Sequence, residues 1–191
     1  VKATDLEIGI TALVRGKIEK EGELTVDSKI LTSFVNLLPN DKVDVESEKN
    51  TISIQSGFYK TKINGTATDD FPVIPEIAKN KGFSIACTDI KKALLSILPS
   101  VSVDDTRPEI NGVFVQVNKE DIVFAGTDSY RLGEFTFSLP AAPSYNGHFI
   151  LPLKTAKEFI RTSSDDDQLM EFWIAENQIL ASYNDTDIVS R

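Results

Sequence analysis

The segment LTVDSKILTSFV, at Leu24–Val35, joins a short apolar stretch to an amphipathic helix, and this arrangement sets the pattern for the chain. It returns as FILPLKTAKEFI at Phe149–Ile160. Two shorter segments return in the same order: ATDL at Ala3–Leu6 as GTDS at Gly126–Ser129, and NTISI at Asn50–Ile54 as NQILA at Asn177–Ala181. A repeat of this length indicates that one supersecondary unit is used more than once.

Three segments have the hydrophobic period of an α-helix. They are Ser28–Leu38, Asp89–Leu98 and Leu153–Arg161. Starting residues are expected as follows: Asp27 or Ser28 caps the first helix, Thr88 or Asp89 caps the second, and Pro152 lies in the first turn of the third. Each helix is only about three turns long, so we expect packing against a sheet to hold it.

Between the helices the hydrophobic period changes to two, as in Val113, Val115 and Val117. This alternation is typical of antiparallel strands with one solvated face. The predicted order is a strand tail followed by three βαβββ units, over about 23–63, 83–138 and 148–191. The fold class is therefore α+β, with helices on one face of antiparallel sheets.

The segment Asn64–Lys81 contains Pro72 and Pro75, has no period, and is expected to connect two domains. The predicted domains are residues 1–78 and 82–191. Both ends of the chain fall within apparent strands, so we expect a fragment of a longer protein whose first domain lacks its beginning.

Composition limits the possible functions of the chain. Its 191 residues carry a net charge of −9, which argues against coating nucleic acid through bulk positive charge. The single cysteine, Cys87, excludes an internal disulfide and a cysteine-based zinc site. No signal peptide and no apolar run near the bilayer-spanning length is present, so we expect a cytoplasmic protein that does not enter a membrane.

No catalytic, metal or cofactor site is predicted. A hydrolase using Asp104 and Asp105 is one alternative, but adjacent carboxylates on one loop tend to point apart. Asp165–Asp167 match no calcium-loop spacing, and we expect a solvated loop there. His148, the only histidine, has no accompanying nucleophile and is expected to be partly buried and structural. Neither a P-loop nor GxGxxG occurs, so no cofactor is expected.

Four motifs together resemble the bacterial DNA sliding clamp, the beta subunit of DNA polymerase III. They are TDLEIGI at Thr4–Ile10, DDFPVIP at Asp69–Pro75, RPEINGV at Arg107–Val113 and GTDSYRLGEF at Gly126–Phe135. The resemblance spans essentially the whole chain. It implies the DNA-clamp fold, with most of the first clamp domain and nearly all of the second.

The resemblance also implies a non-catalytic processivity factor, a ring-shaped homodimer when full length. Such a ring encircles double-stranded DNA without reading its sequence. Its implied partners are the DNA polymerase III catalytic subunit, the clamp loader and other proteins with a clamp-binding motif. A β-rich interaction module without a DNA role is the alternative, which the acidic charge would suit.

Basic residues recur on all three predicted helices. In a clamp they would face DNA phosphates, whereas on an ordinary helix they would form a solvated face. The resemblance favours the DNA-facing interpretation. It also adds Arg107, a loop residue, which is surrounded here by Asp104, Asp105 and Glu109. The expected DNA-facing residues are Lys29, Lys91, Lys92, Arg107, Lys154, Lys157 and Arg161.

The segment Thr127–Leu132 is the best site candidate, since the matching family segment forms half of a peptide-binding pocket. The pocket residues carried over are Ile110, Thr127, Ser129, Tyr130, Arg131 and Leu132. Ile110 and Leu132 would supply apolar walls, and the guanidinium of Arg131 could meet peptide carbonyls or a carboxylate. This chain has SYRL where the family usually has GHRL, and Ser129 restricts the backbone more than glycine would. The alternative interpretation is a simple turn between strands.

Overall fold

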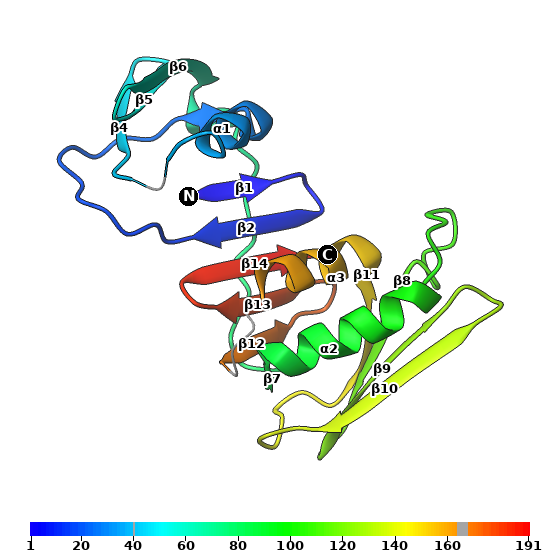
Figure 1. The fold of residues 1–191 in the computed structure, drawn as a ribbon. Coiled ribbons are helices and arrows are strands. Elements are labelled where there is room, and N and C mark those ends of the chain that lie inside the picture. The colour runs from blue at the N-terminus through cyan, green and yellow to red at the C-terminus, as the bar shows by residue number, and fades with distance from the viewer. Residues whose placement is uncertain (40, 164–167) are drawn as a thin grey trace. The chain divides into compact units, whose positions relative to one another are not determined.

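A computed structural model describes residues 1–39, 41–163 and 168–191, so the loop expected at Asp165–Asp167 lies outside the described residues. The chain forms two compact units, Val14–Val73 and a larger unit of Val1–Leu13 with Ile74–Arg191. Figure 1 shows the elements of both. No helix in the described ranges is long and apolar enough to cross a membrane.

The larger unit contains two antiparallel sheets. Its elements are β1 (Lys2–Thr4), β2 (Ile8–Ala12), β7 (Gly82–Ala86), α2 (Cys87–Ile97), η2 (Leu98–Ser100), β8 (Gly112–Val117), β9 (Asp121–Thr127), β10 (Leu132–Ser138), β11 (Gly147–Pro152), α3 (Leu153–Thr162), β12 (Leu169–Ile174), β13 (Ile179–Tyr183) and β14 (Thr186–Ser190). One sheet has the order β1-β2-β14-β13-β12-β7, and the other has the order β10-β9-β8-β11. The expected α+β class with helices on antiparallel sheets is confirmed.

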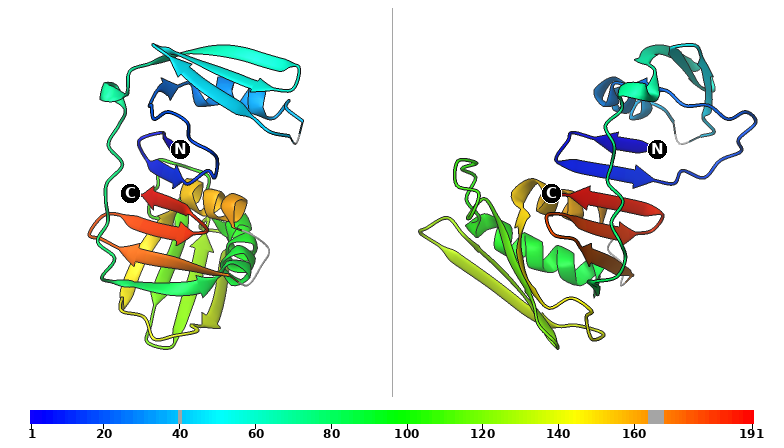
Figure 2. Two further views of the ribbon diagram at one scale, coloured as in Figure 1. Left: turned by 90° about the vertical axis from the view of Figure 1, so that its left-hand side faces the viewer. Right: turned by 180° about the vertical axis from the view of Figure 1, so that it is seen from behind.

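The two βαβββ copies in this unit exchange their first strands, as can be followed in Figure 2. The strand β7, which precedes α2, pairs with β12 of the following copy. The strand β11, which precedes α3, pairs with β8 of the preceding copy. Neither copy can therefore complete its sheet without the other.

The helix α2 fills the space between the sheets. Its residues Ile90, Ala93, Leu94 and Ile97 are all at most 2% exposed, and they pack with side chains of both sheets. Burying one of the isoleucine or leucine side chains contributes roughly 1.5–3 kcal/mol. The helix begins at Cys87, earlier than expected, and Ala86 occupies the cap position without a side-chain hydrogen bond. The predicted caps at Thr88 or Asp89 are therefore wrong.

The helix α3 packs beside α2 and buries Thr155, Ala156 and Phe159. Pro152 occupies the position immediately before the helix, one residue earlier than expected. Leu153 and Ile160 pack at the edge of the same core, and the charged residues of α3 occupy its other face, because only one face of the helix meets the core.

The smaller unit holds one sheet and one helix. Its elements are β3 (Thr25–Val26), α1 (Ser28–Val35), β4 (Asp44–Glu48), β5 (Thr51–Ser56), β6 (Tyr59–Thr66) and η1 (Thr68–Asp70). The strand order is β3-β6-β5-β4. Asp27 caps α1 as expected, accepting hydrogen bonds from the backbone N–H groups of Lys29 and Ile30.

The helix α1 is shorter than expected and poorly covered. It ends at Val35 and not at Leu38, because the N–H groups of Leu37 and Leu38 bond to carbonyls three residues back, at Phe34 and Val35, in place of the α-helical partners four residues back. No residue of α1 is buried, and Ile30 remains 55% exposed. The amphipathic pattern therefore predicted the helix correctly but not the burial of its apolar face.

The segment between the predicted domains is packed and not free. Ile77, 9% exposed, forms a second small core with Leu180 and Val189 of the larger unit. Ile74 and Trp173 pack against the same core. The strands β1 and β2 also lie in the larger unit, where β2 pairs with β14. The predicted boundary between residues 78 and 82 stays a prediction.

Candidate functional site

The turn between β9 and β10, Thr127–Arg131, is held by its own hydrogen bonds. The Thr127 Oγ1 accepts from the backbone N–H of Ser129 at 3.1 Å and donates to the Arg131 carbonyl at 2.7 Å. The Asp128 Oδ1 accepts from the backbone N–H groups of Tyr130 and Arg131 at 3.0 and 2.8 Å. Ser129 adopts a left-handed conformation, with φ of 76°. Threonine and aspartate side chains form such local bonds readily, which explains why the sequence TDS folds into a turn here.

Asp128 and Arg131 also form an ion pair within the turn. The Arg131 Nε and Nη2 donate to Asp128 Oδ2 at 3.0 and 2.7 Å. These bonds, with those from the backbone N–H groups of Arg131 and Tyr130, lower the pKa of Asp128 from 3.8 to about 2. The guanidinium expected to meet a peptide is therefore held by a carboxylate of its own turn.

The loop that follows η2 is hydrogen-bonded to the β9–β10 turn. The backbone N–H of Ser102 lies 3.2 Å from both the Ile110 and Thr127 carbonyls, which places two predicted pocket residues side by side. The Arg107 Nη1 donates to Ser129 Oγ at 3.2 Å, and its Nε donates to Glu109 at 3.2 Å. Arg107 thus contacts the β9–β10 turn.

The six predicted pocket residues lie in these two adjoining loops or at the strand ends that flank them, and several of their apolar side chains reach the solvent. Tyr130 is 95% exposed, Leu132 is 74% exposed, and Ile110 is half-buried. Val103, 83% exposed, adds apolar area on the neighbouring loop. Large exposed apolar side chains are informative when they gather, because they are candidates for contact with a partner.

The turn between β1 and β2, Thr4–Ile8, repeats the hydrogen bonds that the threonine and aspartate side chains make with the backbone of the β9–β10 turn. The Thr4 Oγ1 accepts from the Leu6 N–H at 3.0 Å and donates to the Ile8 carbonyl at 2.9 Å. The Asp5 Oδ1 accepts from the N–H groups of Glu7 and Ile8 at 3.1 and 2.9 Å. The repeated ATDL and GTDS segments therefore encode one turn twice.

The seven basic residues expected to face DNA lie in different surroundings. Lys154, Arg161 and Arg107 each form an ion pair with a carboxylate. Lys92 lies over the ring of Phe135, with Nζ 5.7 Å from the ring centre. Within the part of the chain that is described, Lys29, Lys92 and Lys157 form no ion pair and are exposed, whereas Lys91 is half-buried.

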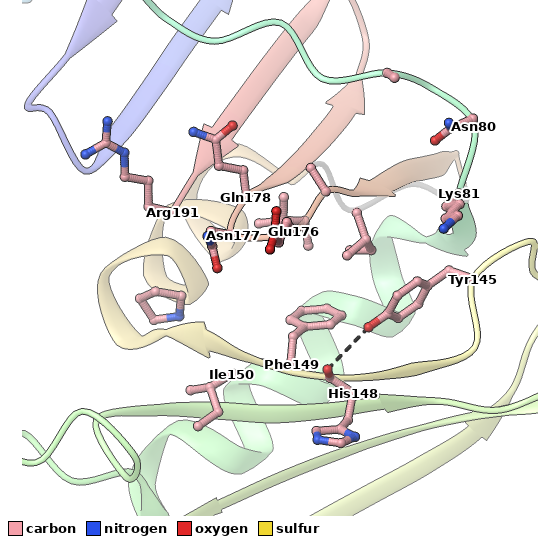
Figure 3. Close-up of a pocket in the computed structure, with 15 residues that line it drawn as sticks. Asn80, Lys81, Tyr145, His148, Phe149, Ile150, Glu176, Asn177, Gln178 and Arg191 are labelled. Atoms are coloured by element: carbon pink, nitrogen blue, oxygen red, sulfur yellow. Dashed lines mark hydrogen bonds between the residues drawn. The ribbon is translucent and has the colours of Figure 1, made fainter.

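A separate cleft of about 910 Å³ lies in the larger unit, as Figure 3 shows. It is lined by β11 on one side and by the β12–β13 turn on the other. The Tyr145 hydroxyl donates to the His148 carbonyl at 3.2 Å, and burial raises the pKa of Tyr145. His148 was expected to be partly buried, but it is exposed. The centre of its ring lies 5.6 Å from the centre of the Phe114 ring. None of the predicted site residues lines this cleft.

Among the residues that the structure describes, no three His, Cys, Asp or Glu side chains are placed to hold a metal ion. Asp104 accepts hydrogen bonds from the hydroxyl and N–H of Thr106, which lower its pKa. The Asp104 carboxylate therefore stabilises the conformation of its own loop.

Sequence reasoning missed the residues that hold the site together. No role was predicted for Asp128, although an aspartate in a turn commonly accepts a hydrogen bond from the backbone two residues later. Ser102 was missed because its bonds join segments that are distant in the sequence. Asp5 and Glu7 were missed as partners of Lys154 for the same reason.

Comparison with known proteins identifies the family. Residues 84–191 match the family model of the DNA polymerase III beta subunit, central domain, and residues 1–75 match that of its N-terminal domain. The beta sliding clamp of Chlamydia muridarum is 24% identical over 190 residues, which are 99% of this chain and 52% of that protein. The beta sliding clamp of Synechococcus elongatus is 27% identical over 196 residues, which again cover 99% of this chain and 52% of that protein. The chain thus spans about half the length of these curated relatives.

Solved structures show the same fold. A putative DNA polymerase III beta subunit from Eubacterium rectale superposes with a TM-score of 0.92 at 23% identity, covering 100% of this chain and 52% of that one. The beta subunit from Thermotoga maritima gives a TM-score of 0.90 at 23% identity, with the same coverage. With both family models matched in order along the sequence, the chain belongs to the family of the DNA polymerase III beta subunit, the bacterial sliding clamp.

Proposed function

We propose that this chain is part of a sliding clamp, a non-catalytic processivity factor of the replicative DNA polymerase in the cytoplasm. The clamp would act as a homodimeric ring around double-stranded DNA and would need no cofactor. The observation that carries the proposal is the match of two successive clamp domain models, together with exposed basic residues on α2 and α3. Cations that meet phosphates and not base edges can hold a duplex without fixing the position along it.

Direct contact with DNA can be tested on this chain with a short fluorescent duplex at low salt. Replacing Lys92 and Lys157 with Met should weaken binding and lower the slope of log affinity against log salt by about 0.9 for each lost phosphate contact. Lys60→Met with Lys119→Met removes two exposed charges from a strand and a turn and is the matched control. An equal loss of DNA affinity in the helix pair and in the control pair would show that Lys92 and Lys157 contribute no more than other exposed lysines.

The β9–β10 turn is the proposed docking site for short peptides of the polymerase catalytic subunit, the clamp loader and other clamp-binding proteins. The exposed Leu132 and Tyr130 offer apolar contacts, and Arg131 can exchange its bond with Asp128 for one with a peptide. A few such anchors can supply most of a peptide's binding energy.

Peptide docking can be measured with a fluorescent peptide that carries the sequence of the polymerase tail. Leu132→Ala and Arg131→Ala should each weaken binding by at least about fivefold, since truncation of an anchor residue typically costs more than about 1 kcal/mol. Leu169→Ala on β12 removes a comparably exposed leucine, 51% exposed, and should change nothing. Unchanged affinity in both turn variants would remove the site assignment.

A further inference from the structure

Lys154 lies at the start of α3 and is held by two carboxylates. Its Nζ is 2.5 Å from Asp5 Oδ2 and 2.9 Å from Glu7 Oε2. Both acids come from the β1–β2 turn, so the contact joins two elements that are far apart in the sequence. The pKa of Lys154 rises to about 12 because of these bonds, first that with Asp5 and then that with Glu7.

The repeated turn explains why Asp5 reaches across to α3. In the β9–β10 turn, Asp128 pairs with Arg131 three residues later. Ile8 stands at the equivalent position of the β1–β2 turn and has no charge to offer. The second carboxylate oxygen of Asp5 therefore pairs with a lysine from another element.

A second basic residue of α3 also pairs with a carboxylate: Arg161 Nη2 lies 2.7 Å from Glu158 Oε2. Lys157 is then the one basic residue of the stripe formed by Lys154, Lys157 and Arg161 with no ion pair to a described residue. The group of Lys154, Asp5 and Glu7 carries a net negative charge of one. Its side chains are 53%, 45% and 72% exposed, so an approaching phosphate meets this group in water.

We propose that Asp5 and Glu7 act as an internal competitor for the phosphate that Lys154 would otherwise bind, and so weaken the hold of α3 on DNA. This inference rests on the proposed function of the helices as the DNA-facing surface. A phosphate must displace two carboxylates before it gains Lys154, and the exposed ion pairs are weak enough to exchange. A clamp that slides benefits from such weak contacts, because each tight phosphate contact must break at every step along the duplex.

The test compares DNA binding of the 191-residue chain with that of Asp5→Asn/Glu7→Gln, using a short fluorescent duplex between about 50 and 200 mM salt. Asparagine keeps the Oδ1 atom that accepts the Glu7 and Ile8 N–H groups, so the turn is retained. Glu7→Gln alone serves as a second variant, because the Glu7 side chain makes no bond within the turn. Glu46→Gln/Glu48→Gln on β4 makes the same change in net charge and is the matched control.

The carboxylate variant should bind about threefold to tenfold more tightly than the control pair at the lower salt, with a slope steeper by about 0.9. The gain should vanish when Lys154→Met is added, and Glu7→Gln alone should give part of it. A gain equal to that of the control, or one that persists with Lys154→Met, would overturn the inference while leaving salt-dependent binding intact. If neither the chain nor any variant binds the duplex at any salt, the proposed DNA contact fails, and this inference fails with it.

Discussion

Leu6 and Ser129 adopt the same left-handed backbone conformation, with φ of 79° and 76°, at the same position of two turns with the same hydrogen bonds. An L-residue in this conformation is strained by roughly 1–2 kcal/mol, whereas glycine is not. The two turns therefore retain strain at one equivalent position in each copy.

The first prediction concerns the order of glycine and alanine at these positions. Leu6→Gly should be more stable than Leu6→Ala by about 0.5–1 kcal/mol, and Ser129→Gly more stable than Ser129→Ala by a similar amount. Urea unfolding of the four variants measures this. Glu134, within β10, is the control site. There Glu134→Ala should be more stable than Glu134→Gly, because glycine in a strand loses more conformational entropy on folding than alanine does. Alanine more stable than glycine at all three sites would show that the turns are unstrained.

The second prediction concerns acid unfolding. Asp5 and Asp128 each have a pKa of about 2, lowered from 3.8 chiefly by hydrogen bonds from Lys154 and from Arg131. A carboxylate with a lowered folded-state pKa stabilises the protein above its unfolded-state pKa, and this stabilisation is lost as the pH falls through the folded-state value. Stability should therefore fall between about pH 4 and pH 2, and less steeply in Asp5→Asn/Asp128→Asn. Carboxyl carbon NMR titrations should give values near 2, and values near 3.8 would contradict the hydrogen-bonded geometry.

The third prediction concerns the segment that follows the smaller unit. Ile77→Ala should lower the free energy of unfolding by about 2–4 kcal/mol, because it opens a cavity between Ile77, Leu180 and Val189. Val73→Ala, at a residue 91% exposed, should stay within about 0.5 kcal/mol of the parent. Equal effects of the two substitutions would mean that the segment is a free linker.

The fourth prediction tests the exchange of first strands. A Cβ atom on Gly82 would overlap the carbonyl oxygen of Phe172 on β12, so Gly82→Ala should destabilise the chain by at least about 2 kcal/mol. Gly16→Ala, where a Cβ would meet nothing within 4 Å, should be neutral or slightly stabilising. A neutral Gly82→Ala would argue against close pairing of β7 with β12.

Local pattern was enough to predict the repeated units, because a helical period and a strand alternation each depend on neighbours in the sequence. The turns at Asn118–Asp121 and Ala175–Gln178 are closed by backbone hydrogen bonds of 2.9 and 2.8 Å, as the polar residues there indicated. The repeated ATDL and GTDS segments were informative for the same reason, since every bond in these turns spans at most four residues.

Contacts between distant segments could not be predicted in this way. Nothing in the sequence near β7 or β11 indicates that each strand joins the sheet of the other copy. The ion pair of Lys154 with Asp5 depends on how the β1–β2 turn is placed on α3, which the helix pattern does not contain. Lys154 was therefore grouped with Lys157 as equally available to DNA, although the structure gives the two residues different surroundings.

Paramagnetic relaxation tests the central claim, that exposed basic residues of α2 and α3 form a DNA-facing surface, most directly. A short duplex with a nitroxide label at its centre is added to the isotope-labelled chain at low salt, and the loss of amide signal intensity is measured. The account predicts the largest losses along α2 and α3, around Lys92 and Lys157, and small losses along β13 and at Lys119. Losses that are equal over all these elements, or largest on β13, would contradict it.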